Sequence, residues 1–241
     1  MSETVFTQVN YTLDALVDQI ELGLIGLPNI QRPFVWKDSK VRDLFDSMYR
    51  GYPVGYLLLW QSSADRTIGP DKKQMPPQLL IVDGQQRLTS LYAIFKGEPV
   101  LRENYEWEKI CIAFNPLEAF NPLEECFQVA DAAIRRNKAF IPDISVIWSE
   151  ETNIFEVVDD YLNGLRASRI VTEVDTKKAK KAIIKLHSLR SFPLTALVLA
   201  QNISEKDVSD VFVRINGTGT PLNQADFILT LMSVFWDEGR A

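Results

Sequence analysis

The chain has 241 residues, of which 46% are hydrophobic and 24% are charged, and its formal net charge at pH 7 is −6. This composition is ordinary for a folded globular protein, and the length suffices for one domain of about 200 residues with an appendage. The negative charge argues against a protein that binds nucleic acid over its whole surface. The sequence has no apolar run long enough to cross a membrane and no leader at Met1, so we expect a cytoplasmic protein.

Histidine and cysteine are scarce, which narrows the chemistry available to this chain. The single histidine, His187, excludes a His-Asn-His nuclease centre within the chain and most metal sites built on histidine. The two cysteines, Cys111 and Cys126, lack the spacing of a zinc site. We therefore predict neither a zinc site nor a disulfide framework.

Hydrophobic periodicity predicts a mixture of helices and strands in chain order. Apolar stripes predict helices near residues 13–20, 38–50, 88–95, 154–165, 175–190, 204–215 and from 223 onward, and we expect Asp38-Ser39 to cap the second of them. Short apolar runs predict strands at 54–60, 79–82, 107–114, 126–129 and 192–200. This order predicts an α+β (mixed α/β) fold. We expect a core over residues 1–150 and a more helical extension, packed on that core, over 151–241.

The most informative motif is the polar pentapeptide Asp83-Gly84-Gln85-Gln86-Arg87. It falls where a buried strand turns into a helix, and the first N–H groups of a helix are unsatisfied and carry partial positive charge. A tight turn through Gly84, with Arg87 one turn into the helix, would form a small phosphate cradle.

A structural alternative exists for the same motif. Asp83 and Gln86 have the spacing of a reciprocal helix cap, in which each side chain satisfies the other residue's backbone. The second glutamine and Arg87 favour the cradle, because a cap needs neither.

A second polar pair, Gln31-Arg32, precedes the aromatic residues Phe34 and Trp36. Arginine suits bidentate contact with phosphate, and glutamine can contact an amide or a base edge. The alternative is that Arg32 packs over Trp36 as a cation–π pair on the surface.

A third segment, Phe212-Val213-Arg214-Ile215-Asn216, ends a predicted helix and precedes a loop with two glycines. The alternative to a binding role is an ordinary helix C-terminus, with Asn216 or Gly217 in the left-handed conformation. Asp226 and Asp83 could together hold a divalent metal ion, although acidic residues at helix starts are usually caps.

The predicted helix over 175–190 carries five lysines and one arginine against Asp175 as its acid, a local charge of +5. Such a run could contact a phosphate backbone. A solvated helix face is the commoner explanation, and we favour it.

In this order and spacing, the motifs resemble the family known as domain of unknown function 262, the GmrS-like N-terminal domains of GmrSD-type, modification-dependent (type IV) restriction systems. The stretches that carry the resemblance are IQRPFVW, GYPVGYLLLW, IVDGQQRLTSL and FVRINGTGTPLNQADF, and together they extend over nearly the whole chain.

The resemblance implies a ParB/sulfiredoxin-like core with a small mixed sheet, and a site that binds and hydrolyses a nucleoside triphosphate, coupled to the sensing of modified DNA. Carried over by position, the nucleotide motif is Asp83, Gly84, Gln85, Gln86 and Arg87. The remaining site residues are Gln31 and Arg32 of the stretch IQRPFVW, which we call the first motif, and Phe212 and Asn216 of the stretch FVRINGTGTPLNQADF, which we call the third motif.

For this site we expect Arg32 and Arg87 to hold phosphate charge, Gln85 or Gln86 to orient water, and Asp83 to act as base or to hold a divalent metal such as Mg²⁺. Full-length members act with a His-Asn-His nuclease domain or subunit, which this chain lacks. Two other functions stay open: a nucleotide- or modified-DNA-sensing module without turnover, and a ParB-like nuclease.

Overall fold

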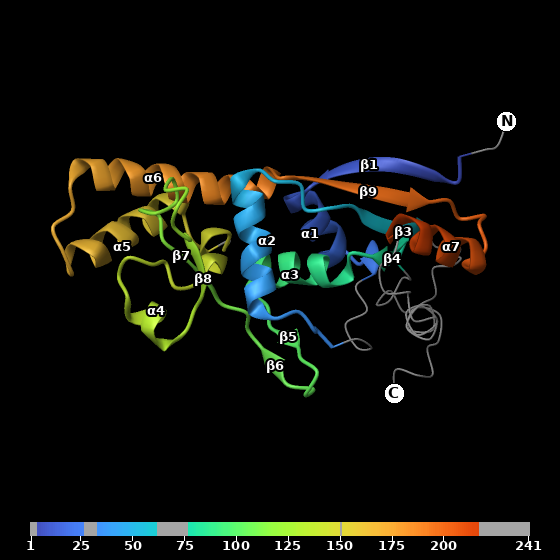
Figure 1. The fold of residues 1–241 in the computed structure, drawn as a ribbon, viewed down its shortest axis with the longest axis horizontal. Helices are drawn as coiled ribbons and strands as arrows, with labels where there is room; N and C mark the ends of the chain where they lie inside the picture. Colours follow the sequence, from blue (N-terminus) through green and yellow to red (C-terminus); the bar gives the residue numbers. More distant parts are fainter. Residues whose placement is uncertain (1–3, 27–32, 62–76, 150, 217–241) are drawn as a thin grey trace. The chain divides into compact units, whose positions relative to one another are not determined.

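A computed structural model describes residues 4–26, 33–61, 77–149 and 151–216 (Figure 1). Within these ranges the fold is α+β, as predicted, and helices alternate with strands of a small mixed sheet. The chain forms two compact units, unit 1 (1–33, 55–85 and 193–241) and unit 2 (34–54 and 86–192). The domain boundary expected near residue 150 stays a prediction.

Unit 1 is built on a five-stranded sheet with the strand order β1-β9-β3-β4-β2. β1 pairs antiparallel with β9, β9 parallel with β3, β3 antiparallel with β4, and β4 parallel with β2. Its elements are β1 (Phe6–Thr12), α1 (Leu13–Glu21), β2 (Ile25–Gly26), β3 (Leu57–Gln61), β4 (Leu79–Asp83), β9 (Pro193–Leu199) and α7 (Glu205–Asn216). A strand from late in the sequence therefore lies between two strands from its first quarter.

Helix α7 packs on one face of this sheet (Figure 1). Residues from β3, β4 and β9 and from α7 form one hydrophobic cluster: Leu58, Trp60, Leu80, Val82, Leu199, Val208 and Phe212. The alternation of side chains along a strand explains why Leu58 and Trp60 belong to this cluster and Leu59 does not. The indole N–H of Trp60 donates to the Ala200 carbonyl at 3.2 Å, so the polar atom of this side chain also has a partner.

Unit 2 is mainly helical. Its elements are α2 (Asp38–Arg50), α3 (Gln85–Lys96), β5 (Val100–Leu101), β6 (Trp107–Glu108), β7 (Ile112–Phe114), β8 (Phe127–Val129), α4 (Ala132–Arg136), α5 (Ile154–Arg166), α6 (Glu173–His187) and two short 3₁₀ helices, Ile144–Ile147 and Ser188–Ser191. In the part of the chain that the structure describes, no helix combines the length and apolarity needed to cross a bilayer.

Aromatic rings fill the core of unit 2. Tyr49 packs against both Phe114 and Phe127, at ring-centroid distances of 5.4 and 5.6 Å, and Phe95 stacks on Trp148 at 5.0 Å. The two polar rings keep hydrogen bonds. The Tyr49 hydroxyl donates to the Ala182 carbonyl at 3.3 Å, and the Trp148 indole N–H donates to the His187 carbonyl at 3.2 Å. Both bonds fix α6 against this core.

Two expectations about local structure were wrong. The single strand predicted over 107–114 is divided, because β6 pairs with β5 whereas β7 pairs with β8. Between them Lys109 turns to an ion pair with Asp143 at 2.9 Å. The helix predicted to be capped by Asp38 and Ser39 instead has Lys37 at its N-cap, with no capping bond from that side chain.

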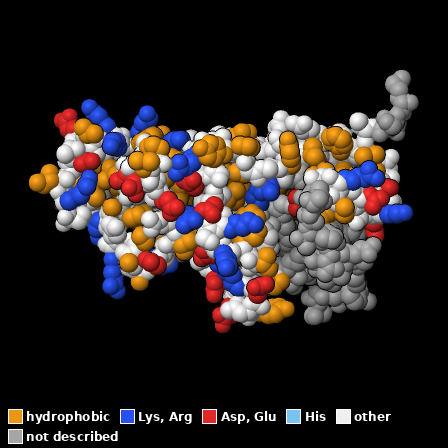
Figure 2. All heavy atoms as spheres, in the orientation of Figure 1, with side chains coloured by type: hydrophobic (Ala, Val, Ile, Leu, Met, Phe, Trp, Pro, Cys, Tyr) orange, Lys and Arg blue, Asp and Glu red, His pale blue; other side chains and the backbone are white. Residues whose placement is uncertain are grey.

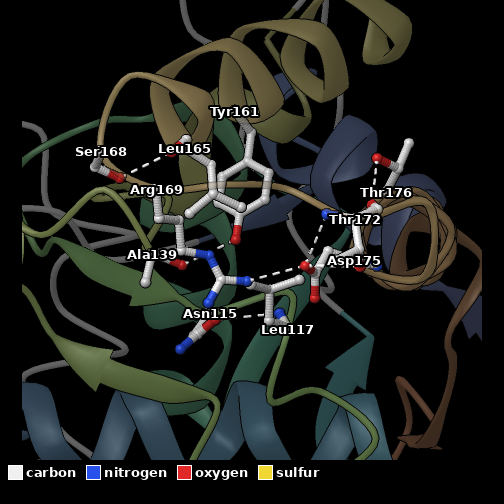
Figure 3. Close-up of polar contacts among 10 residues, drawn as sticks. All are labelled: Asn115, Leu117, Ala139, Tyr161, Leu165, Ser168, Arg169, Thr172, Asp175 and Thr176. Atoms are coloured by element: carbon white, nitrogen blue, oxygen red, sulfur yellow. Dashed lines mark hydrogen bonds and ion pairs between the residues drawn. The ribbon is translucent and has the colours of Figure 1, made fainter.

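A reciprocal cap begins α6 (Figure 3). The Thr172 hydroxyl oxygen accepts from the Asp175 N–H at 3.1 Å, and the Asp175 carboxylate accepts from the Thr172 N–H at 3.1 Å. Arg169, which precedes the helix, reaches the same carboxylate at 3.3 Å. Hydrogen bonds to Thr172 are the main reason that the pKa of Asp175 is lowered from its ordinary value.

Replacing Thr172 by Ala is expected to lower the free energy of unfolding by about 1 kcal/mol at neutral pH, because an N-cap acceptor is lost. Asp175→Asn should also destabilise the protein, but only at neutral pH. A carboxylate whose pKa is lowered on folding stabilises the folded state above its unfolded pKa of about 3.8, and this contribution is lost as the pH falls through the lowered value.

Urea denaturation at a series of pH values measures both effects. The matched control is Val174→Ala, because Val174 is an exposed residue in the same first turn. A difference between wild type and Asp175→Asn that stays constant on acidification would contradict this account of the cap.

Candidate functional site

The polar pentapeptide forms a tight turn between β4 and α3. β4 ends at Asp83, Gly84 has a φ of +92°, and α3 begins at Gln85. A residue with a Cβ rarely adopts this backbone conformation, which explains why the turn contains glycine. The predicted tight turn through Gly84 is confirmed.

A β-bulge precedes the turn. Leu59 pairs with Ile81 but Leu58 pairs with Asp83, so Val82 is an extra residue in β4. A bulge bends its strand and changes the direction of the following side chains. Asp83 is therefore presented at the end of β4 by an irregularity of the sheet rather than by a regular strand.

The N-terminus of α3 has the features of an anion-binding site. The side chains of Gln85, Gln86 and Arg87 in its first turn are partly buried, and this turn has no acidic residue. The N–H groups at a helix start carry partial positive charge. An anion at this position would meet main-chain donors.

Gln86 forms hydrogen bonds with the backbone of Val35 and Trp36, at the end of the first motif. Its Oε1 atom accepts from the N–H groups of Val35, at 3.0 Å, and Trp36, at 3.4 Å. This contact joins residues that are 50 and 51 positions apart. Whether Asp83 and Gln86 also form the reciprocal helix cap stays an open alternative.

Arg102, which sequence reasoning missed, fixes the same segment from the other side. Its guanidinium donates to the Trp36 carbonyl at 3.0 Å, to the Asp38 carboxylate, and to Glu108 at 3.2 Å. Its side chain is only 15% exposed. Arg102 follows the short strand β5, and nothing in the local sequence indicates that two of its partners, Trp36 and Asp38, lie more than sixty residues earlier.

Two described cations, Lys40 and Arg102, lie over the aromatic rings of the first motif. Lys40 Nζ lies 4.2 Å from the centroid of the Trp36 ring, and the Arg102 guanidinium lies 5.2 Å from that of Phe34. Phe34 is buried and donates its N–H to the Leu101 carbonyl at 2.7 Å. This segment is thus held by its rings as well as by its backbone.

The third motif lies next to the end of β4 within unit 1. Phe212 is 7% exposed and packs in the cluster that contains Val82, the residue before Asp83. This packing gives Phe212 a structural role, and its predicted contact with a nucleotide stays a prediction. Asn216 is the last residue of α7, and its side chain is outside the part of the molecule that the structure describes.

The remaining predicted site residues, Gln31, Arg32 and Asp226, lie outside the described residues. The structure therefore brings Val35 and Trp36 to Gln86 in unit 2, and Phe212 to Val82 in unit 1. Asp83, Gly84 and Gln85 connect these two places along the chain. Whether Gln31 and Arg32 share a cleft with the turn stays a prediction.

In the described part of the chain, the acidic and sulfur-containing residues form no metal-binding cluster. Among the described residues, no group of three or more His, Cys, Asp or Glu side chains has the geometry to hold a metal ion. Burial raises the pKa of the Cys126 thiol to about 11, and it also raises that of Cys111. Neither thiol is an activated nucleophile, because both are protonated at neutral pH.

The basic helix α6 has the solvent-exposed face that we favoured. Its lysines, and Arg190 after it, are exposed: Lys177, Lys178, Lys180, Lys181 and Lys185. Lys181 and Lys185 also lie over the rings of Phe120 and Tyr49, at 5.1 and 4.3 Å. On the face drawn in Figure 2, basic and acidic side chains are interspersed over unit 2.

Taken together, these features define an α+β fold with a candidate anion site at a strand-to-helix turn, where α3 begins with Gln85, Gln86 and Arg87 directly after Gly84. The family model described as the N-terminal domain of the GmrSD restriction endonuclease matches residues 13–233. The chain belongs to this family, and the predicted resemblance is confirmed.

A relative from Methanocaldococcus jannaschii, the uncharacterized protein MJ0686, is 24% identical to this chain over 242 residues. The match includes 89% of this chain and 40% of the relative. The chain thus spans about two fifths of the length of this longer protein.

Replacing Gln86 by Leu is expected to lower the free energy of unfolding by about 1–3 kcal/mol, because the Val35 and Trp36 N–H groups lose their acceptor. Gln86→Glu keeps an acceptor oxygen and should cost less. Hydrogen exchange of the Val35 and Trp36 amides measures the effect directly. Equal protection of these two amides in wild type and Gln86→Leu would contradict the proposed role of Gln86.

Replacing Arg102 by Lys keeps the charge but removes the planar fork that reaches three partners. We expect faster hydrogen exchange over residues 34–38 and a loss of about 1–3 kcal/mol in the free energy of unfolding. The control is Arg136→Lys, at an exposed position on α4. If Arg102→Lys leaves exchange over residues 34–38 unchanged, the cation is sufficient and the fork is not required.

Proposed function

We propose that this chain binds a nucleoside triphosphate at the β4–α3 turn and hydrolyses it, and that this reaction regulates a modification-dependent DNA restriction system. The observation that carries the proposal is the turn itself: Gly84, at a φ of +92°, joins the end of β4 directly to the N-terminus of α3, with Arg87 in its first turn. Family membership supports the restriction context.

The triphosphate would be bound chiefly through its charge. The first N–H groups of α3 and the Arg87 guanidinium supply donors for phosphate oxygens. Arg32 is proposed to add a second guanidinium, with Gln31 beside it. The support for this addition is that Arg32 is three residues from Val35, whose N–H donates to Gln86.

The hydrolytic step requires an oriented water molecule, and the two glutamines differ in their suitability. The carbonyl oxygen of Gln86 already accepts from two backbone N–H groups. We therefore assign the orientation of water to Gln85 and a positioning role to Gln86. Asp83 is proposed to act as the base or to hold a divalent ion such as Mg²⁺, which would supply further charge stabilisation at the phosphates.

The third motif is proposed to complete the nucleotide site. Phe212 anchors α7 beside Val82, and the following turn of the helix ends at Asn216. Asn216 carries both a donor and an acceptor, which suits contact with a base or a ribose.

In the whole system, this chain is proposed to act with DNA that carries a modification and with a His-Asn-His nuclease domain or subunit, in the cytoplasm. Two alternatives remain distinct from hydrolysis: a sensor that binds nucleotide or modified DNA without turnover, and a ParB-like nuclease.

Replacing Arg87 by Ala is expected to lower kcat for nucleotide hydrolysis by about 10²–10³-fold, because one positioned charge at the phosphates is lost. Phosphate release with Mg²⁺ and each of the common nucleoside triphosphates measures the activity. The control is Lys180→Ala, which removes an exposed cation from α6. Thermal unfolding shows whether each variant keeps its fold.

The outcomes separate the three functions. Nucleotide binding by wild type without phosphate release identifies a sensor. Cleavage of labelled DNA by this chain without added nucleotide identifies a nuclease. Normal hydrolysis by Arg87→Ala would show that the turn is not the phosphate site.

A further inference from the structure

β1 is an exposed edge strand of the unit 1 sheet. It pairs with β9 over seven residues in one unbroken register, and on its other side none of the described strands pairs with it. Its residues are mostly exposed, and Phe6 is 44% exposed. Figure 2 shows mainly uncharged side chains along this edge.

β1 has none of the usual features that prevent an edge strand from pairing with another chain. Such strands typically carry a charged residue, a proline or a bulge. From Thr4 to Thr12 the sequence has no charged residue and no proline, and the pairing with β9 has no register shift.

The backbone of β1 determines which of its residues can pair outward. The Val5 carbonyl accepts from the Ala200 N–H at 2.9 Å, so the backbone N–H and C=O groups of Val5 point toward β9. Because the N–H and C=O groups of alternate residues point to opposite sides of a strand, Phe6, Gln8 and Asn10 direct theirs away from β9.

We propose that this edge pairs with β1 of a second copy of the chain, antiparallel and about a two-fold axis at Val9. In this register Gln8 lies opposite the partner's Asn10, and Phe6 lies opposite the partner's Thr12. Residues whose backbone N–H and C=O groups point away from β9 therefore lie opposite residues of the same kind, as an antiparallel ladder requires. With the two-fold axis at Val9, all seven residues of β1 lie opposite a residue of the partner's β1. With the axis at Gln8 or Asn10, fewer residues of β1 would be paired.

The side chains are compatible with this pairing. Gln8 and Asn10 are exposed, and each can donate to and accept from the other's amide. At the axis Val9 meets the partner's Val9, a β-branched pair that suits a sheet. The absence of charge means that two identical strands do not repel each other. The two sheets would join into one continuous sheet of ten strands, twice the five of each copy.

The test uses two double variants with the same number of substitutions. Gln8→Lys/Asn10→Lys places two cations opposite each other in the proposed register. Gln8→Lys/Asn10→Glu places opposite charges there instead. Both replace Asn10, whose amide oxygen accepts from Thr195 Oγ1, so the loss of this amide is common to the two variants.

Sedimentation velocity at low salt and over a range of protein concentrations measures self-association. We expect the wild type to dimerise, the Lys/Lys variant to have a dissociation constant at least about tenfold higher, and the Lys/Glu variant to dimerise as the wild type does. Added salt should partly restore the Lys/Lys dimer, because it screens the repulsion. Far-UV circular dichroism and urea denaturation check that both variants are folded.

A third variant tests the backbone. Gln8→Pro removes an N–H group that points away from β9, so it should abolish dimerisation and leave the ladder with β9 in place. A monomeric wild type would overturn the proposal. It would also be overturned if the Lys/Lys and Lys/Glu variants associated to the same extent, since the register then would not be the one proposed.

Discussion

The left-handed backbone at Gly84 is the constraint on which the candidate site depends. It is the point at which the chain leaves the last residue of β4, in unit 1, and enters α3, which belongs to unit 2 from Gln86 onward. A residue with a Cβ would disfavour the turn, and the helix start would no longer follow directly on the buried strand. The bulge at Val82 acts on the same few residues, because it determines how Asp83 leaves the sheet.

Gln86 is a motif residue whose hydrogen bonds connect two parts of the chain. Its carbonyl oxygen ties together two motifs that are fifty residues apart, and Arg102 holds the same segment through the Trp36 carbonyl and Asp38. Two independent contacts therefore fix the residues that follow Arg32 in sequence. Preorganisation of this kind matters for phosphate chemistry, in which positioning and electrostatics provide most of the catalysis.

Hydrophobic periodicity was sufficient to predict the main helices, the strands next to the pentapeptide and the Gly84 turn. It failed for β1, which the prediction omitted, because most residues of this edge strand are exposed and only Val9 and Tyr11 are partly buried. It failed also for 107–114, where a continuous pattern hides two pairings with different partners. Arg102 could not be found in this way, since its role depends on contacts with Trp36 and Asp38 that only the folded chain creates.

The central position of β9 has a consequence for the order in which the protein folds. Residues of β1 and β3 are synthesised early, yet the strand that lies between them, Pro193–Leu199, emerges from the ribosome only after all of unit 2. Until then β1 has no partner strand in the described sheet, and β3 lacks one of its two neighbours. Contacts of such large sequence separation slow folding and leave strand edges open to association. During synthesis unit 2 can complete its own contacts first, and the sheet of unit 1 closes around β9 last.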